Sequence, residues 1–364
     1  MANNNNNHLL IYGANGYTGR LITELAVSKG LKPILAGRNK AAIQELAARF
    51  HLPYIIADLN DKEALNDAVL MADVVLHCAG PFVNTALPML EACMRNGAHY
   101  LDITGEIQVF EMVAARNNAI KEAGIMAMPG VGFDVVPSDC LAAYLKKQLP
   151  SATHLTLAFA GLGGGISHGT ASTALLNIDK GGAVRLNGKI TPVPNAFKIR
   201  NINFGNKELQ TITIPWGDVS TAYYSTGIPN IEVYMAASNM MLKVYRAVES
   251  LQWFMKRNFV KQFLQTRIDK SITGPSEQKR KNARSIIWGQ VTDEKGNSAI
   301  ARVTLPEGYT TTALTALNIA QKALAGNAPV GFKTPSLAYG PDLIMETKGV
   351  TREDVLLSKK IRVE

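Results

Sequence analysis

The chain has 364 residues, of which 47% are hydrophobic, and it carries a net charge of +9. This length predicts two domains with buried cores, and the three cysteines (Cys78, Cys93 and Cys140) are too far apart in sequence for a disulfide framework or a Cys-x-x-Cys site. The polar run at residues 1–7 lacks the apolar centre of a signal peptide, and the most apolar window, residues 155–178, is interrupted by glycines and hydroxyls. We therefore expect a cytoplasmic protein without a membrane span.

The first predicted elements are a buried strand, a glycine turn and a helix. The apolar run Leu9–Tyr12 enters Gly13-x-x-Gly16-x-x-Gly19, and a helical pattern of apolar residues follows. In such a turn the first glycine allows the tight bend, the second lets backbone amides approach a pyrophosphate, and the third lets the helix pack on the strand. We expect a dinucleotide at this turn. Its predicted contacts are Gly13, Asn15, Gly16, Tyr17, Thr18 and Gly19.

The end of the next strand predicts which dinucleotide binds. The apolar run Pro33–Ala36 ends in Gly37, Arg38 and Asn39, where an NAD-binding fold usually carries an acidic residue for the ribose 2′-hydroxyl. No carboxylate stands there to repel a 2′-phosphate, and a guanidinium forms charge-assisted hydrogen bonds to one. The expected cofactor is therefore NADP. The other interpretation is that Arg38 is a solvated charge at a strand end.

Strands and helices continue to alternate as far as residue 128. We predict helices at 40–50, after a capping box at 60–63, at 85–96 and at 105–123, and strands at 54–57, 73–80, 99–103 and 125–128. This alternation predicts an α/β fold with a doubly wound parallel sheet, which binds ligands outside the carboxyl ends of its strands. The further cofactor-binding candidates at those ends are Asp58, Ala79, Gly80, Pro81, Phe82, Asp102 and Thr104.

A glycine-rich segment, residues 129–139, ends the first domain, and a helix is expected to restart near residue 138. Beyond it we predict a mostly antiparallel sheet with one covered face, from strands at 154–159, 199–204, 210–214 and 231–236 and a hairpin joining 286–292 to 299–305. Helices are expected at 170–179, 240–270 and 311–325. We therefore assign residues 1–135 to a dinucleotide-binding domain and 136–308 to an α+β substrate or dimerisation domain, and expect residues 309–364 to return to the first.

Several motifs together resemble the saccharopine dehydrogenase-like oxidoreductases, and in particular the bacterial branch that includes the trans-acting enoyl reductases. Besides the glycine turn, they are Ala36-Gly37-Arg38, Ala79-Gly80-Pro81-Phe82, Tyr100-Leu101-Asp102-x-Thr104-Gly105-Glu106, Gly132-Phe133-Asp134-x-x-Pro137-Ser138-Asp139 and Glu307-Gly308-Tyr309-Thr310. The resemblance implies a Rossmann domain, a separate substrate domain and NADP-linked hydride transfer. It does not extend to saccharopine as substrate, because the family's saccharopine reductases carry a Gly-Leu-Asp-Pro-Gly-like turn where this chain has residues 132–136.

Two residues are candidates for proton transfer. Asp134 follows the sixth predicted strand, where it either orients the nicotinamide amide or transfers a proton; the other interpretation is a turn residue that caps the next helix. His168 stands at the start of a predicted helix, where it either donates a proton or binds an anionic group, or only caps and packs. Glu106 is interpreted as a first-turn carboxylate favoured by a helix dipole.

These residues predict an NADPH-dependent reductase of a carbonyl, imine or enoyl group on a small-molecule, acyl or carrier-linked substrate. The alternative is a non-catalytic NADP-binding protein that acts as a membrane-associated or assembly scaffold. The sequence has no Ser-His-Asp order, Walker loop or cluster of metal ligands, so hydrolase, nucleotidase and metal-centre readings have no support.

The positive charge is concentrated in residues 240–285, which contain eleven Lys or Arg and three acids and so carry +8 of the net charge. Three interpretations fit this segment. In the first, it forms a solvated helix pair whose aromatic residues pack in the second domain or in a dimer contact. In the second, it docks an acidic carrier or acyl-CoA, or lies peripherally on an anionic membrane. In the third, it binds nucleic acid. No recognised nucleic-acid-binding module accompanies the charge, so we do not expect the last. We expect a homo-oligomer, in the simplest case a homodimer.

Overall fold

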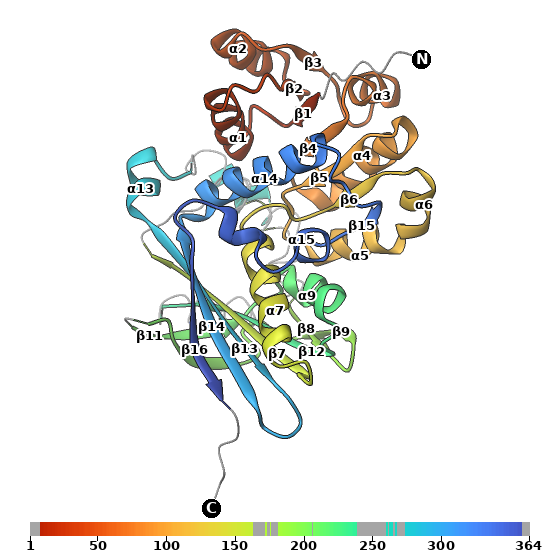
Figure 1. The fold of residues 1–364 in the computed structure, drawn as a ribbon. Coiled ribbons are helices and arrows are strands. Elements are labelled where there is room, and N and C mark those ends of the chain that lie inside the picture. Colours follow the sequence, from red (N-terminus) through yellow and green to blue (C-terminus); the bar gives the residue numbers. More distant parts are fainter. Residues whose placement is uncertain are drawn as a thin grey trace, which may run out of the picture. The chain divides into compact units, whose positions relative to one another are not determined.

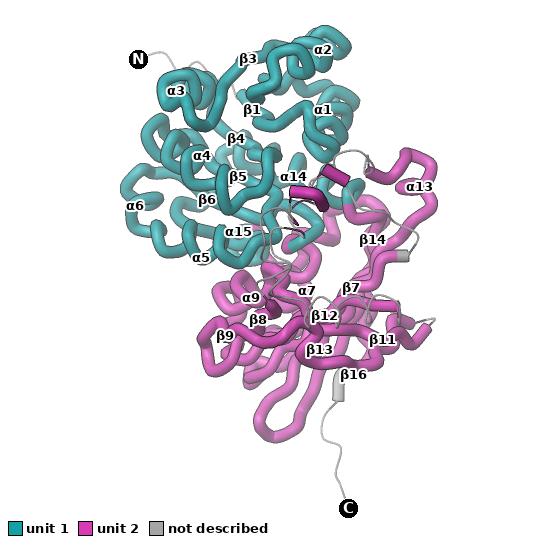
Figure 2. The backbone as a smooth tube through the Cα atoms, turned by 180° about the vertical axis from the view of Figure 1, so that it is seen from behind, with its two compact units in different colours: residues 1–134, 309–338 teal, residues 135–308, 339–364 magenta. Residues whose placement is uncertain are grey.

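The chain forms two compact units, shown in teal and magenta in Figure 2. Unit 1 comprises residues 1–134 and 309–338, and unit 2 comprises residues 135–308 and 339–364. The computed structural model describes residues 8–162, 172, 175, 181–205, 207–238, 260, 262–264, 266–267 and 274–358. Unit 1 holds the glycine turn and all of the predicted cofactor-binding residues.

Unit 1 is built on a seven-stranded parallel sheet with helices between its strands (Figure 1). The strands, in spatial order, are β15 (Gly331–Phe332), β6 (Met126–Met128), β5 (His99–Asp102), β4 (Val74–His77), β1 (Leu9–Tyr12), β2 (Ile34–Gly37) and β3 (Tyr54–Ile56). The chain order reverses between β1 and β4, so the doubly wound sheet predicted from the alternating pattern is confirmed. Ligands of such sheets bind at this switch point.

The central strands of unit 1 are short apolar runs because both of their faces are covered. All residues of β1, β2 and β4 are buried, as expected of parallel strands that lie beneath helices on both sides. The helices of unit 1 are α1 (Tyr17–Ser28), α2 (Lys40–Phe50), α3 (Lys62–Leu70), α4 (Phe82–Asn96), α5 (Ile107–Ala115), α6 (Asn117–Glu122), α14 (Gly308–Leu324) and α15 (Pro335–Tyr339).

The segment predicted as one helix at 105–123 is two helices, α5 and α6, which meet at Arg116. The backbone N–H of Arg116 binds the carbonyl oxygen of Val113, and its guanidinium binds that of Met112 (3.0 Å), the oxygen that would accept the next helical hydrogen bond. A side chain has thus replaced a backbone donor, which ends the first helix. Apolar periodicity continues across the break, so the sequence pattern did not reveal it.

Unit 2 is built on a mixed sheet that is antiparallel except where β7 pairs with β12. Its main path is β10 (Ile199–Asn203), β11 (Glu208–Thr213), β12 (Asn230–Ala236), β7 (His154–Leu162), β13 (Arg284–Thr292), β14 (Ser298–Pro306) and β16 (Thr351–Ser358), and the hairpin β8 (Gly182–Leu186) and β9 (Lys189–Val193) joins β12. The helices are α7 (Val136–Gln148), α9 (Asp218–Thr226) and α13 (Glu277–Asn282), followed by a 3-10 turn, η1 (Leu343–Glu346). The second α+β fold and its predicted β13–β14 hairpin are confirmed.

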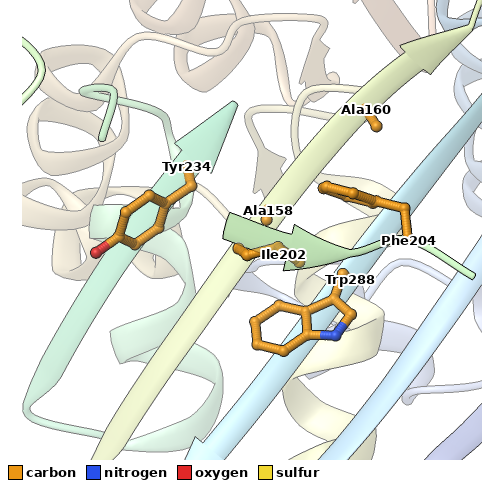
Figure 3. Close-up of a cluster of buried hydrophobic side chains, with 6 residues drawn as sticks. All are labelled: Ala158, Ala160, Ile202, Phe204, Tyr234 and Trp288. Carbon is orange, nitrogen blue, oxygen red and sulfur yellow. The ribbon is translucent and has the colours of Figure 1, made fainter. Parts of the chain in front are cut away.

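Both faces of the unit 2 sheet are covered in part. Helix α7 lies so close to β13 that a Cβ atom at Gly289 would be 2.7 Å from Leu145. On the other face a cluster forms around Trp288 and Tyr234, whose strands flank Ala158 of β7 (Figure 3). Its remaining members are Ala160, Ile202 and Phe204, so strand β10 contributes to the same cluster. One covered face was predicted for this sheet. In the structure, the second face is also covered in part, by residues of β10 and the loop after it.

The C-terminal segment does not return to the first domain as a whole. Residues 309–338 group with unit 1, where β15 pairs with β6, whereas residues 339–364 group with unit 2. The reason is strand β16, which pairs with β14 over Thr304↔Thr351 to Ser298↔Ser358. The expectation that 309–364 returns intact is therefore corrected for its last part.

Candidate functional site

The loop after β1 requires glycine at two positions. Gly13 has a φ of 78°, and a Cβ atom there would lie 2.8 Å from the Cβ atom of Ala79. A Cβ atom at Gly19 would lie 2.4 Å from the carbonyl oxygen of Gly13, inside van der Waals contact. The Gly13 N–H donates to the carbonyl oxygen of Ala36 (2.8 Å), which ties the turn to β2. The backbone packing is thus that of a dinucleotide-binding turn.

The same turn meets the end of the second strand. The Asn15 side-chain oxygen lies 3.2 Å from the place of a Cβ atom at Gly37, and the Asn15 carbonyl accepts a hydrogen bond from Arg20 Nε (3.0 Å). Asn15 and Gly37, both predicted cofactor residues, are therefore brought together although they are far apart in sequence. A larger residue at the end of β2 would crowd the Asn15 side chain and the Ile43 side chain, which lies 3.1 Å from the same position.

Helix α1 begins directly after the turn with an uncapped N-terminus. Gly16 is its N-cap residue and has no side chain to accept from the first amides of the helix, and no acidic residue lies in its first turn. In contrast, Asn39 caps α2 and Asp61 caps α3 through their side chains. The backbone amides and partial positive charge at a helix start suit an anion, and at α1 the N-cap residue supplies no acceptor of its own. The residues present therefore fit a dinucleotide whose pyrophosphate binds at the start of α1.

Two charged residues lie at the carboxyl ends of β2 and β3. The Tyr12 hydroxyl donates to the carbonyl oxygen of Ala57 (2.9 Å), and burial raises the pKa of Tyr12 to about 12; the charge of Asp58 acts in the same direction and that of Arg38 opposes it. Arg38 is exposed and, within the described part of the chain, forms no hydrogen bond or ion pair. Its guanidinium is therefore available for a phosphate.

The Glu106 carboxylate caps helix α4 rather than the helix that follows it in sequence. Its Oε1 accepts from the Phe82 N–H (2.8 Å) and its Oε2 from the Val83 N–H (2.9 Å). Helix α4 consequently starts at Phe82, earlier than the predicted residue 85. The interpretation of Glu106 as a carboxylate in a helix dipole is correct in kind, but the dipole is that of α4. The anion position at the start of α4 is filled by the protein itself.

Asp102 and Thr104 were expected at the cofactor, but their side chains are wholly buried and join loops together. Asp102 Oδ1 accepts from the N–H groups of Thr104 and Gly130 (2.9 Å each), and Oδ2 accepts from the Tyr100 hydroxyl (2.6 Å). Burial raises the pKa of Asp102 to about 6, although these hydrogen bonds lower it. Thr104 Oγ1 accepts from the Glu106 N–H (3.0 Å). Their effect on a cofactor site is to position the loops after β5 and β6.

Asp134 lies on the loop after β6, with its carboxyl group against Gly105. A Cβ atom at Gly105 would be 2.9 Å from Asp134 Oδ2 and 3.1 Å from Asp134 Cβ, so the glycine makes room for this side chain. Burial raises the pKa of Asp134 to about 7. A carboxyl group that titrates near neutral pH is suited to give or take a proton. The other catalytic candidate, His168, and most of the basic segment 240–285 lie outside the described residues.

Two features of the site were missed in the sequence. The rings of Tyr309 and Tyr17 pack edge to face, with 5.0 Å between their centroids, which places the start of α14 beside the glycine turn. His77 is buried beneath the loop after β4 and bonds to Thr85. The first had a signal in the Glu307–Thr310 motif, to which no role was assigned. The second has a signal only in the unusual presence of a histidine at the end of an apolar run.

Two general features bear on the class of site. Among the described residues, no group of three or more His, Cys, Asp or Glu gathers where it could hold a metal ion. Within the same part of the chain, every helix is too short or too polar to span a bilayer.

Comparison with known families agrees with the turn geometry. Residues 9–128 match the family model described as saccharopine dehydrogenase NADP binding domain. The mouse saccharopine dehydrogenase-like oxidoreductase is 29% identical over 51% of this chain and 50% of its own length, so the chain matches about half of that relative. A lipid droplet localized protein of Caenorhabditis elegans is 25% identical over 77% of each chain. A trans-acting enoyl reductase of Mycobacterium leprae is 33% identical over 38% of this chain and 35% of its own.

A solved structure extends the similarity of fold to both units. Saccharopine dehydrogenase (L-Glu forming) from Saccharomyces cerevisiae in its apo form superposes with a TM-score of 0.67 and covers 96% of this chain and 100% of its own. The two sequences are 15% identical, so this likeness concerns the fold. The family resemblance and the fold predicted from the sequence motifs are both confirmed.

Proposed function

We propose that this chain, which is similar to the saccharopine dehydrogenase-like oxidoreductases, binds NADP(H) at the glycine turn and transfers hydride at a carbonyl, imine or enoyl carbon. The observation that carries the proposal is the start of α1 after the Gly13 turn, at the switch point of the sheet, where the N-cap residue is a glycine and the first turn holds no acid. The neighbouring helix starts are occupied by Asn39, Asp61 and Glu106. The start of α1 therefore stands out as the place for a pyrophosphate.

The preference for NADP over NAD is proposed to depend on Arg38. It follows β2, which is where the adenosine ribose of a dinucleotide lies in this class of sheet, and its guanidinium has no partner of its own among the described residues. Asp58 follows β3, and its charge acts on the same Tyr12 hydroxyl. We assign Arg38 to the 2′-phosphate and Asp58 to the outer, adenine side of the site.

Proton transfer is assigned to Asp134. When bound, the nicotinamide cofactor supplies or accepts the hydride. Reduction of a carbonyl, imine or enoyl group also needs a proton, and Asp134 holds one at and below neutral pH because burial raises its pKa to about 7. After giving this proton the carboxylate regains one from solvent. Asp102, whose oxygens accept three hydrogen bonds, is better suited to fix the loop than to exchange protons.

The substrate class is proposed from two relatives. Their names are trans-acting enoyl reductase and lipid droplet localized protein, and both point towards acyl or lipid-linked molecules rather than amino acids. The capped start of α4 supports this proposal, since Glu106 repels a substrate carboxylate from that helix. We propose an acyl or carrier-linked carbonyl or enoyl substrate.

The test is NADPH binding followed by turnover. Fluorescence titration of the purified chain should show saturable NADPH binding that is tighter than NADH binding. Stopped-flow absorbance should then show NADPH oxidation with at least one member of a panel of carbonyl, imine and enoyl compounds, including acyl-CoA thioesters. Binding of neither nucleotide would refute the cofactor site. Tight NADPH binding without oxidation by any panel member would favour the non-catalytic scaffold.

A further inference from the structure

His77 is a buried polar residue for which the proposed chemistry gives no role. It is the last residue of β4, its side chain is 0% exposed, and its ring is surrounded by the rings of Tyr12 (5.5 Å), Phe82 (5.3 Å) and Tyr100 (6.5 Å). Its Nδ1 atom is buried and, among the described residues, has no hydrogen-bond partner. Burying a polar ring in such an apolar place is costly, so we expect its second nitrogen to make a specific hydrogen bond.

The other ring nitrogen is engaged. His77 Nε2 lies 3.1 Å from Thr85 Oγ1, and the same hydroxyl lies 2.6 Å from the carbonyl oxygen of Ala79. A hydroxyl has one hydrogen, and the carbonyl oxygens of Ala79 (2.6 Å) and Pro81 (3.2 Å) both lie within reach of it, so the hydrogen points to a carbonyl and the shorter contact favours Ala79. Thr85 must therefore accept from His77, which assigns the ring hydrogen to Nε2. Nδ1 is then left as a lone pair, which is less costly to bury alone than an N–H group.

The chain of hydrogen bonds ends at Ala79, which packs against the glycine turn. Ala79 is the residue against which Gly13 packs, since a Cβ atom at Gly13 would lie 2.8 Å from Ala79 Cβ and 2.9 Å from Ala79 N. The position of Ala79 therefore sets how closely the loop after β4 approaches the loop after β1. These two loops flank the switch point of the sheet, where the dinucleotide is proposed to bind.

We propose that His77 is a positioning residue for the dinucleotide site: by donating to Thr85 it directs the threonine hydroxyl to Ala79 and so holds this loop against Gly13. This inference rests on the proposed function, because it assigns His77 to the NADP(H) site. It also explains why the histidine is surrounded by aromatic rings, since they exclude water that would otherwise compete for Thr85. His77 itself does not contact the cofactor.

The test is a double-mutant cycle on NADPH affinity. His77→Leu removes the donor, whereas His77→Gln keeps an amide N–H that reaches Thr85. Thr85→Val removes the hydroxyl, whereas Thr85→Ser keeps it. We expect His77→Leu and Thr85→Val each to weaken NADPH binding about five- to tenfold, as for the loss of one buried hydrogen bond, with Gln and Ser restoring most of it. Because the two residues act in series, the double variant should bind no more weakly than Thr85→Val alone.

A control separates positioning from general loss of stability. Val69→Ala truncates a buried side chain in α3 and should lower the unfolding temperature without changing NADPH affinity. The inference is overturned if the His77 and Thr85 effects multiply, if affinity follows unfolding temperature across all variants, or if no variant changes affinity. Should His77→Leu fail to fold, three variants still test the inference: Thr85→Val should weaken NADPH binding, whereas Thr85→Ser and His77→Gln should bind nearly as the wild type does, and any other pattern overturns it. Failure of the wild-type chain to bind NADPH would instead refute the proposed function.

Discussion

Arg38 is the residue whose replacement distinguishes the two nicotinamide nucleotides most directly. Arg38→Ala should weaken NADPH binding by roughly 1.5 to 3 kcal/mol, about ten- to a hundredfold, because a charge-assisted contact to the 2′-phosphate is lost. NADH has no such phosphate, so its affinity should stay within about twofold. Fluorescence titration with both nucleotides measures the two constants.

Arg49→Ala is the matched control for Arg38. It removes an exposed arginine near the end of α2, the helix that follows Arg38, and among the described residues Arg49 contacts Glu24 and the neighbouring Phe50 ring. It should leave both affinities unchanged. Equal losses of NADPH and NADH affinity in Arg38→Ala would show that the residue supports the loop instead of reading the phosphate.

The roles of some individual residues could be predicted from the sequence, and those of others could not. Gly13, Gly19 and Arg38 were predicted because their roles depend on local backbone shape and charge, which spacing reveals. The environment of Asp102 was not predicted, since one of its hydrogen-bond donors, Gly130, is 28 residues away along the chain. A carboxylate that binds a ligand and one that holds two loops together look the same in the sequence.

At the scale of single elements, the start of α4 depends on a carboxylate from another segment. Glu106→Ala would leave the Phe82 and Val83 amides without their acceptors and remove a negative charge from the helix start. We expect it to lower the free energy of unfolding by about 1.5 to 3 kcal/mol, as for charged hydrogen bonds to buried amides. Urea unfolding followed by circular dichroism measures the change.

Two further variants show whether this cap acts as described. Glu106→Gln keeps one oxygen acceptor and should recover part of the loss. Glu91→Ala removes a partly exposed acid from the same helix, which among the described residues pairs with Arg95, and should cost about 0.5 kcal/mol or less. A loss in Glu106→Ala no larger than that in Glu91→Ala would contradict the capping role.

Element positions were predicted well where a local signal exists and poorly where the partner is distant. Helix α2 has the bounds expected from its periodicity, 40–50, because Asn39 supplies its cap from the adjacent position. The start of α4 was missed because its cap comes from Glu106. The short strand β15 was not foreseen, since two residues carry no periodicity and its pairing with β6 is set by the fold.

At the scale of the whole chain, the sequence established two domains but not how the C-terminal part is shared between them. Alternating strands and helices predicted the first sheet, and alternating apolar residues predicted the second. The chain leaves unit 1 after residue 134, supplies α14 and β15 to it, and then adds β16 to the edge of the other sheet. Such an excursion depends on which sheet edge is open, a property of the folded protein that no segment carries alone.

Unit 1 buries titratable groups whose effects on stability have opposite signs. Burial lowers the pKa of His77 to about 3, so the unfolded chain binds the extra proton below pH 6.5 and acid destabilises the fold. Burial raises the pKa of Asp134 to about 7, so between about pH 3.8 and 7 the folded protein keeps a proton that the unfolded chain releases. Raising the pH through this range therefore favours unfolding through Asp134, while it favours folding through His77.

These opposite signs predict opposite pH dependences for two variants relative to the wild type. Asp134→Asn removes the penalty of ionising a buried carboxyl. The free energy of unfolding of the variant minus that of the wild type should therefore increase by about 1 to 3 kcal/mol from pH 5 to pH 8. His77→Gln removes a group whose protonation in the unfolded chain favours unfolding in acid. The free energy of unfolding of this variant should therefore rise relative to that of the wild type as the pH falls from 6.5 towards 4. Urea unfolding of the three proteins across this range measures both slopes. A difference between Asp134→Asn and wild type that is the same at pH 5 and pH 8 would mean that Asp134 ionises near its ordinary pKa, and the proton-transfer role assigned to it would lose its basis.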